Sequence, residues 1–290
     1  KRLNALSLRV EALPAVSGDR GLASGSLCNV RLTTQSGVPI TTSDRTAQGT
    51  IYLTPFQGSI LSIYNGSSWK LFNFTEISLS LSGLTSSKNY DVFVYDNSGT
   101  PTLELSTAWT NDTTRANALT TVGGVLVKSS ATTRRYVGTI RTTSTTTTED
   151  SQTKRFVWNH CNRVTRSMFV GDNTASWTYA STARAANNST ANRLQYVAGQ
   201  ADALVNAHAK VYLAAASATK CGIGIGLDST SSDSSKIRGP DNFGTGVDYT
   251  NYGVAYYAGY PGVGFHYLQW LEFANGTCTF SNQSGNLANG

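Results

Sequence analysis

Paired carboxylates are the residues of this sequence best suited to catalysis, because cleavage of a glycosidic bond needs two of them about 5–10 Å apart across a sugar. Glu149 and Asp150 are adjacent, and neighbouring side chains in a strand point to opposite faces. Asp228 and Asp233 fall in one polar loop, and Glu272 lies close to aromatic residues. None of these groups forms a distinctive pair, so we expect no enzymatic activity, with glycan depolymerisation as the alternative.

Nucleophilic and metal-dependent chemistry find less support. The sequence lacks the strained GxSxG turn that positions the serine of many hydrolases. His208 alternates with apolar residues and is expected to face solvent, whereas His160 and His266 have aromatic neighbours and are expected to pack. The loop 228–233 (DSTSSD) offers oxygen atoms to Ca²⁺ but lacks the DxDxDG order and the distal glutamate of a calcium loop. We predict a solvated turn there, and no metal or cofactor.

The four cysteines, Cys28, Cys161, Cys221 and Cys278, lie far apart in the sequence. No CxxC or other metal-ligand spacing is present. Four cysteines in 290 residues are also too few for the disulfide framework of a small secreted domain. We therefore expect buried or incidental thiols, with one long-range disulfide as the alternative.

Aromatic residues are concentrated between residues 249 and 270. Exposed Tyr and Trp rings bind sugars because their apolar faces stack on sugar rings while polar neighbours bond the hydroxyls. The competing interpretation is core packing, since alternation along two strands would bury half of the rings. The binding surface is predicted at the loop before residue 251 and the tyrosines after it, with these residues: Asp241, Asn242, Asp248, Tyr249, Asn251, Tyr257 and Tyr260.

The composition is that of a β-rich protein with an uncharged polar surface. Charged residues make up 14% of the chain, against roughly 25% in typical soluble domains. The net charge is +6, but no run of basic residues exceeds two, so no nucleic-acid-binding stripe is predicted. No apolar segment reaches the length of about 18 residues that a spanning helix needs, so no membrane insertion is predicted.

A short heptad pattern opens the chain. Leu3, Leu6, Val10 and Leu13 follow the a/d spacing of a coiled coil, and Pro14 would end the helix. Because so short a coiled coil is unstable alone, we expect the end of a longer helical stalk. The first residue is Lys1 rather than Met, which also predicts a piece of a longer protein. The alternative is one amphipathic helix packed on its own domain; a stalk leading into a β head favours a homotrimer joined through the heptad residues.

After the stalk the sequence predicts strands and turns at the spacing of sandwiches and barrels. Asn65-Gly66 between apolar runs predicts a hairpin, and the alternation of residues 205–213 predicts a half-buried strand. Residues 122–127 are predicted to form one strand. The glycines at 222, 224 and 226 alternate with isoleucine and predict a tightly packed strand rather than a phosphate-binding loop.

We therefore expect an all-β fold of sandwich or jelly-roll-like domains after a short N-terminal coiled-coil-like helix. The predicted organisation is the end of a stalk at 1–16, a linker at 17–27, a first β domain at 28–110 and a second at 111–290. The boundary is placed near residues 106–115, where a polar segment separates two groups of strands. The alternative is that both β portions pack as one unit.

Several strings of the sequence, in order, resemble a family of tailed-bacteriophage and prophage virion proteins that are tail-fibre-like. The resemblance covers roughly Cys28 to the C-terminus. It implies a virion location and a structural or receptor-binding role, and it brings no catalytic motif. The matching strings are residues 36–41, 50–69 (TIYLTPFQGSILSIYNGSSW), 89–97, 108–115, 124–143, 149–164 and 264–272.

These observations favour a virion fibre or receptor-binding protein that binds a host surface, a glycan in the first place, without catalysis. The expected partners are two further copies of the chain, other virion proteins through an upstream region, and the host glycan or receptor. A structural component such as a head fibre, decoration or tail-connector subunit is the first alternative. A polysaccharide-cleaving tailspike is the second.

Overall fold

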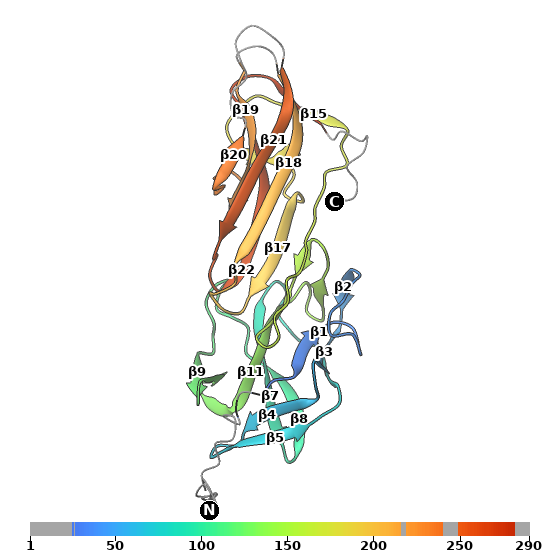
Figure 1. Ribbon diagram of the computed structural model, residues 1–290, viewed down its shortest axis with the longest axis vertical. Helices are drawn as coiled ribbons and strands as arrows, with labels where there is room; N and C mark the ends of the chain where they lie inside the picture. Colours follow the sequence, from blue (N-terminus) through green and yellow to red (C-terminus); the bar gives the residue numbers. More distant parts are fainter. Residues whose placement is uncertain (1–24, 26, 216–218, 240–248, 282–290) are drawn as a thin grey trace, which may run out of the picture.

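The computed structural model describes residues 25, 27–215, 219–239 and 249–281, and their regular structure is almost entirely β. The molecule is elongated, with β1 to β11 toward the lower end in Figure 1 and β15 to β23 toward the upper end. The 3-10 turn η1 (Ala186–Asn188) is the one helical element among the described residues. The all-β prediction is therefore confirmed.

The predicted stalk helix of residues 1–16, with Leu3, Leu6, Val10 and Leu13, lies outside the described residues. Of the predicted linker, only Gly25 and Leu27 are described. In the described part of the chain, no helix has the length and apolar character needed to cross a membrane.

The N-terminal unit, residues 27–161, forms three sheets of its own with the orders β1-β3-β6, β4-β5 and β8-β7-β11-β10-β9, and β14 joins the last by pairing with β11. Its strands are β1 (Val30–Thr33), β3 (Thr50–Pro55), β4 (Ile60–Tyr64), β5 (Trp69–Asn73), β6 (Ile77–Ser80), β7 (Asn89–Asn97), β8 (Thr100–Leu105), β9 (Leu119–Val122), β10 (Val125–Lys128), β11 (Ala131–Arg141) and β14 (Val157–Asn159).

Alternating apolar residues build one core for this unit. Ile51 and Leu53 of β3 and Leu61 and Ile63 of β4 are fully buried, two residues apart in each strand as the strand period requires. The predicted hairpin at Asn65-Gly66 is confirmed, because β4 and β5 pair antiparallel around it.

The C-terminal unit, residues 168–281, buries a second core between two sheets. One sheet has the order β15-β23-β18-β21-β20, and β22 of the other pairs with β16, β17 and β19. Both sheets contribute to the core, for example Leu213 and Phe280 from the first and Ile223 and Leu268 from the second. The strands are β15 (Ser176–Tyr179), β16 (Arg184–Ala185), β17 (Arg193–Ala198), β18 (Val205–Ala215), β19 (Cys221–Leu227), β20 (Ile237–Gly239), β21 (Tyr249–Gly259), β22 (Gly264–Ala274) and β23 (Cys278–Ser281).

The two units are joined through a sheet that takes strands from both. β2 (Arg45–Gln48), β12 (Thr148–Asp150) and β13 (Lys154–Arg155) continue the sheet of β16, β17, β19 and β22, and β13 pairs parallel with β17. The division between the two cores does not coincide with the predicted boundary near residue 110. β7 and β11, which lie before and after that boundary, pair along Asn89–Val94 in one sheet.

The expectation of free thiols is wrong, and so is the alternative of a single bridge. Cys28 is bonded to Cys161 and Cys221 to Cys278, and no described cysteine is free. The Cα atoms are 6.1 Å and 6.2 Å apart, within the range that a disulfide spans. Sequence spacing missed both bonds because each joins segments that only the sheets bring together.

The prediction that residues 122–127 form one strand is wrong. β9 ends at Val122 and β10 begins at Val125, and the two strands pair with each other. Gly123 and Gly124 turn the chain between them with φ of +56° and +82°, values that favour glycine. The apolar residues on both sides made the run look continuous, whereas the glycine pair is the hairpin turn.

Candidate functional site

The structure does not gather the predicted binding residues into one exposed surface. Asp241, Asn242 and Asp248 lie outside the described residues, and Tyr249 is described only as the first residue of β21. Asn251 is half-buried near that end of the strand. Tyr257 is 4% exposed and packs in the core, whereas Tyr260 is 65% exposed beyond the other end of β21. Asn251 and Tyr260 are therefore roughly 30 Å apart along an extended strand.

The alternation of β21 explains this separation. Gly253, Ala255 and Tyr257 face the core, so Tyr252, Val254 and Tyr256 face outward on the opposite side of the sheet. Alternation buries Tyr257 and leaves Tyr252 and Tyr256 partly exposed, but the expected burial of half of the aromatic rings is not met. Among the described side chains of residues 249–270, Tyr257 is the one buried Tyr, Phe or Trp.

The outward residues of β21 and their partners on β18 form one surface, which we call the tyrosine face. Directly opposed residues of an antiparallel pair lie on the same side of the sheet. The register pairs His208 with Tyr256, Lys210 with Val254 and Tyr212 with Tyr252. The tyrosine face consists of Asn206, His208, Lys210, Tyr212, Tyr252, Val254 and Tyr256.

Contacts within the tyrosine face hold its rings in place. The His208 and Tyr256 ring centroids are 4.8 Å apart, and the Tyr256 hydroxyl donates a hydrogen bond to Asn206 Oδ1 at 3.1 Å. The Tyr212 and Tyr252 rings meet edge to face at 5.6 Å. The Lys210 ammonium lies 4.1 Å from the centre of the Tyr252 ring, a cation–π contact.

This surface combines flat apolar rings with hydrogen-bonding groups. Asn206, His208 and Lys210 are exposed, Tyr252 and Tyr256 are partly exposed, and Val254 is 44% exposed. The predicted exposure of His208 is therefore confirmed. Rings that stack on sugars beside an amide, an imidazole and an ammonium that bond hydroxyls are the usual components of a carbohydrate-binding surface.

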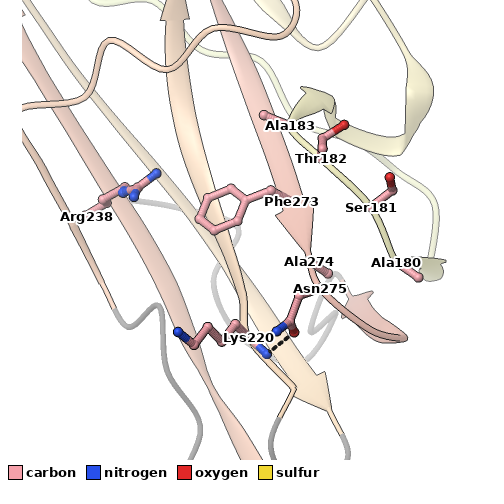
Figure 2. A pocket seen from close by; sticks show the side chains of 9 residues that line it. All are labelled: Ala180, Ser181, Thr182, Ala183, Lys220, Arg238, Phe273, Ala274 and Asn275. Carbon is pink, nitrogen blue, oxygen red and sulfur yellow. Dashed lines mark hydrogen bonds between the residues drawn. The ribbon is translucent and has the colours of Figure 1, made fainter.

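A second candidate is a pocket of about 740 Å³ on the C-terminal unit, which we call the Phe273 pocket. Figure 2 shows Arg238 and Lys220 on one side of the Phe273 ring and Ser181 and Thr182 on the other. The Arg238 guanidinium lies 4.9 Å from the ring centre and pairs with Asp233 at 2.9 Å. Burial raises the pKa of Asp233, but the hydrogen bonds from Ser235 and the charge of Arg238 outweigh it and lower that pKa overall.

The Phe273 pocket escaped sequence analysis because separate segments line it. Residues 180–183, Lys220, Arg238 and the end of β22 meet only in the folded chain. The backbone N–H of Lys220 donates to Asn275 Oδ1 at 2.6 Å, and the N–H of Asn275 donates to the Lys220 carbonyl at 2.9 Å. A hydroxyl pair, an aromatic ring and two cations make this pocket suited to a polar or acidic small ligand.

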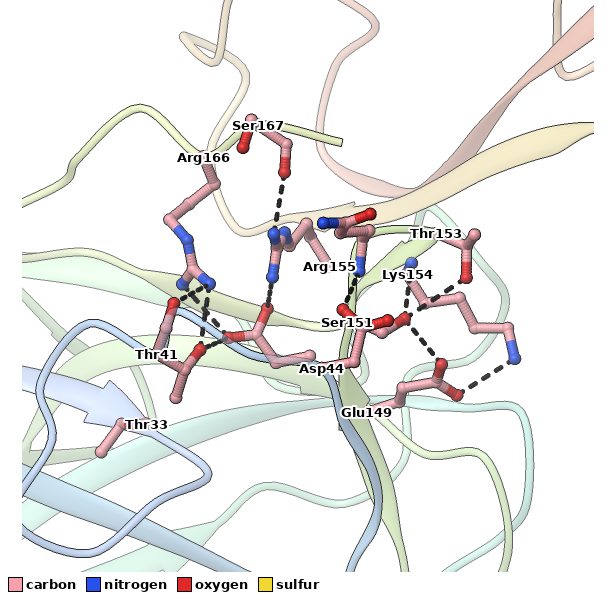
Figure 3. A network of polar contacts seen from close by, with 12 residues as sticks. Thr33, Thr41, Asp44, Glu149, Ser151, Thr153, Lys154, Arg155, Arg166 and Ser167 are labelled. Atoms are coloured by element: carbon pink, nitrogen blue, oxygen red, sulfur yellow. Dashed lines mark hydrogen bonds and ion pairs between the residues drawn. The ribbon is translucent and has the colours of Figure 1, made fainter. Parts of the chain in front are cut away.

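The carboxylates considered for catalysis each contact cations or hydrogen-bond donors. Asp150, 3% exposed, accepts from Arg155 at 2.9 Å, from Arg166 at 3.1 Å and from the Thr41 hydroxyl at 3.0 Å. Figure 3 shows Arg155, Arg166 and Thr41 close to one another, at the strands that join the two units. Glu149 points the other way, as predicted, and pairs with Lys154 at 3.0 Å.

The remaining acidic candidates, in the C-terminal unit, also have hydrogen-bond or ion-pair partners. Glu272 is fully buried and accepts from Arg184 Nε at 2.8 Å and from the Trp177 indole. Asp228 is bonded to His266 Nδ1 at 2.8 Å. Among the described residues, no three His, Cys, Asp or Glu side chains gather as a metal site would require.

The other histidines pack as expected. His160 packs against Tyr136 and Trp158, with ring centroids 5.4 Å and 6.4 Å away. Burial lowers the pKa of His160, although its hydrogen bond to Gln200 opposes the shift. His266 is 4% exposed beside Tyr196, and its bond to Asp228 had no signal in the sequence.

Comparisons of this chain with models of known protein families, with curated proteins and with solved structures give no match.

Proposed function

We propose that the protein is a receptor-binding fibre component of a tailed-phage virion and that its tyrosine face binds a glycan of the host surface without catalysis. The observation that carries this proposal is the arrangement of Tyr212, Tyr252 and Tyr256 beside Asn206, His208 and Lys210 on one exposed sheet face. Such rings offer apolar area at low entropic cost, because the contacts between them already restrict their motion.

The architecture supports an extracellular role. The C-terminal unit is interpreted as a β-sandwich, since two sheets enclose its core. Two disulfides suit a protein that works outside a reducing cytosol, such as one on a virion surface. A homotrimer would present three tyrosine faces, so weak binding at each would add up to a high avidity.

The absence of catalysis is part of the proposal. Glu149, Asp150 and Glu272 each form an ion pair with a basic side chain, and Asp150 and Glu272 are fully committed to buried contacts. A general acid of a glycosidase must instead hold a proton next to the sugar oxygen. These pairs favour structural roles for the acidic groups.

Binding to an array of bacterial surface polysaccharides tests the proposal, with Tyr256→Ala and Tyr252→Ala as variants. An aromatic contact contributes on the order of 1 kcal/mol beyond its buried area, so each variant should bind about tenfold more weakly. Tyr95→Ala is the matched control, because Tyr95 is a partly exposed tyrosine of β7 in the N-terminal unit that stacks on Arg134. Binding that is absent in the native protein, or equal in all variants, would contradict the proposal.

A structural role in the virion is the second candidate, favoured by apolar side chains next to the tyrosine face. Ile237 of β20 is 65% exposed and lies opposite Tyr256, and Val254 is 44% exposed. Together they would suit a contact with another subunit. Light scattering distinguishes the two functions: a loss of assembled mass in Ile237→Ser and Tyr256→Ala identifies a subunit interface, and an unchanged mass with weaker glycan binding identifies a receptor site.

A further inference from the structure

Arg135 of β11 is a buried cation without a counter-ion in the described part of the chain. It is 3% exposed. Its Nη1 donates to the Leu27 carbonyl at 2.8 Å and to the Ser62 carbonyl at 2.7 Å, and it also contacts the Ser62 hydroxyl. Its Nε is buried and has no hydrogen-bond partner. All of these contacts are with neutral groups.

Two other arginines of the N-terminal unit, the half-buried Arg115 and the buried Arg141, differ in this respect. Arg115 pairs with Asp91 at 2.9 Å and Arg141 with Asp112 at 2.8 Å. Removing a cation from water without a nearby anion costs several kcal/mol. Burial lowers the pKa of Arg135 to about 10, and no acidic group of the described residues offsets this effect. Arg135 is still charged at neutral pH, so an anion that binds next to it would be stabilised by its charge.

A cavity of about 540 Å³ opens beside Arg135, and we call it the Arg135 cavity. His160 lines it together with the Cys28–Cys161 disulfide and the Gly123-Gly124 turn. The His160 Nδ1 is held by Gln200 Oε1 at 3.0 Å, whereas its Nε2 makes no hydrogen bond within the described residues.

The charges around this cavity are predominantly positive. Arg163 follows the disulfide but is neutralised by Asp202 at 2.7 Å. Arg31 donates to the Asn162 carbonyl on the wall of the cavity, is 3% exposed, and forms no ion pair with a described residue. Asp150 partly offsets the charge of Arg31, and the remaining field of Arg31 and Arg135 favours an anion in the cavity.

We propose that the Arg135 cavity binds the oxyanion group of a small ligand, a carboxylate or a phosphate, with Arg135 as its main contact. The described residues supply no hydrogen-bond acceptor to the Nη2 group of Arg135, so this group can donate a charge-assisted hydrogen bond to an oxygen of such a ligand. The cavity volume suits a ligand the size of a sugar acid or a sugar phosphate. The disulfide fixes one wall before binding, so little ordering is needed. This site lies in the N-terminal unit and is independent of glycan binding at the tyrosine face.

Titration of the purified full chain with inorganic phosphate, acetate and glucuronate tests the proposal. Sodium chloride at equal ionic strength is the reference, and calorimetry and the thermal unfolding midpoint are the readouts. At least one oxyanion should bind and raise the midpoint above the chloride reference, because a ligand of the native state stabilises it. A response to phosphate alone identifies a phosphate ligand, and a stronger response to glucuronate than to acetate identifies a sugar acid.

The variant Arg135→Gln should weaken this binding at least tenfold. Arg134→Gln is the matched control, since the neighbouring Arg134 is paired with Glu104 and stacks on Tyr95 outside the cavity. A shift of the Arg135 Nε–H signal in the NMR spectrum of the unaltered protein provides a test that does not depend on the folding of a variant. The proposal is overturned if no oxyanion exceeds chloride and the Nε–H signal stays fixed, or if Arg135→Gln binds as well as the unaltered chain.

Discussion

Buried carboxylates in the described residues all lie against a basic side chain. Asp91 contacts Arg115, Asp150 contacts Arg155 and Arg166, and Glu149 and Glu272 have cations of their own. At the residue scale, a buried charge that has a partner is interpreted as structural, whereas a buried charge that has none among the described residues is a candidate for ligand binding. Arg135 is buried to a similar degree as Asp150 but has no opposite charge among the described residues, which is why we infer a ligand there.

Asp150→Asn should lower the free energy of unfolding by about 3–5 kcal/mol, because it leaves two arginines facing each other without a carboxylate. Urea unfolding followed by fluorescence measures the change. Asp202→Asn is the control, since the Asp202 side chain is 56% exposed in a surface pair with Arg163 and should change the stability by no more than about 1 kcal/mol. Equal effects of the two variants would show that the contacts of Asp150 with Arg155 and Arg166 stabilise the protein no more than a surface ion pair does.

Strand alternation decides the chemistry of each sheet surface at the element scale. β18 and β21 place Ala, Val, Leu and Tyr257 inward and the tyrosine face outward. Alternation in β19 serves close packing on both faces rather than an exposed surface. Its isoleucines face the core, while Gly224 and Gly226 face the loop that contains Asp233. A Cβ atom on Gly226 would lie 2.3 Å from the Ser229 carbonyl oxygen, so the predicted tight packing of this strand is confirmed.

Gly226→Ala should therefore destabilise the C-terminal unit by about 1–3 kcal/mol, since backbone rather than a flexible side chain stands in the way. The thermal unfolding midpoint is the measurement. Gly239→Ala is matched to it as another strand glycine, and a Cβ there meets nothing within 4 Å. Loss of stability in both variants would point to backbone flexibility instead of crowding.

The whole molecule is an elongated pair of units, each with its own core and its own disulfide. Cys28–Cys161 ties the start of the N-terminal unit to the segment after β14, and Cys221–Cys278 ties β19 to β23. The shared sheet and the ion pairs of Asp150 with Arg155 and Arg166 join the units at their boundary. Such an arrangement separates the Arg135 cavity from the tyrosine face, so the two proposed sites should act independently.

Removing the disulfides should destabilise the two units unequally. The bonds join residues 133 and 57 positions apart, which corresponds to about 5 kcal/mol and about 4 kcal/mol of loop-closure entropy in the unfolded chain. Cys28→Ser with Cys161→Ser should therefore cost about 1 kcal/mol more than Cys221→Ser with Cys278→Ser in urea unfolding. Peptide mapping without reductant checks the pairing directly, and four alkylated cysteines in the native protein would contradict it.

Local patterns in the sequence were enough to predict strands, the Asn65-Gly66 hairpin, the exposure of His208 and the alternation of β18. These features depend on the order of apolar and polar residues within a few positions, which the sequence displays directly. Alternation along residues 249–259 also implies two faces that both carry tyrosine, but it does not say which one is buried. Its place in the C-terminal core, opposite the buried Ala207 of β18, puts Tyr257 inward and leaves Tyr256 on the outward face.

Tertiary structure alone decided the features that depend on distant segments. The partners of Cys28 and Cys221, the pairing of β7 with β11 across the expected boundary, and the lining of the Phe273 pocket all join residues far apart in the chain. That no described residue is a counter-ion of Arg135 is of the same kind, because charge pairing depends on neighbours in space rather than in sequence. Periodicity is a property of neighbouring residues, whereas these sites arise from long-range contacts that form when the sheets assemble.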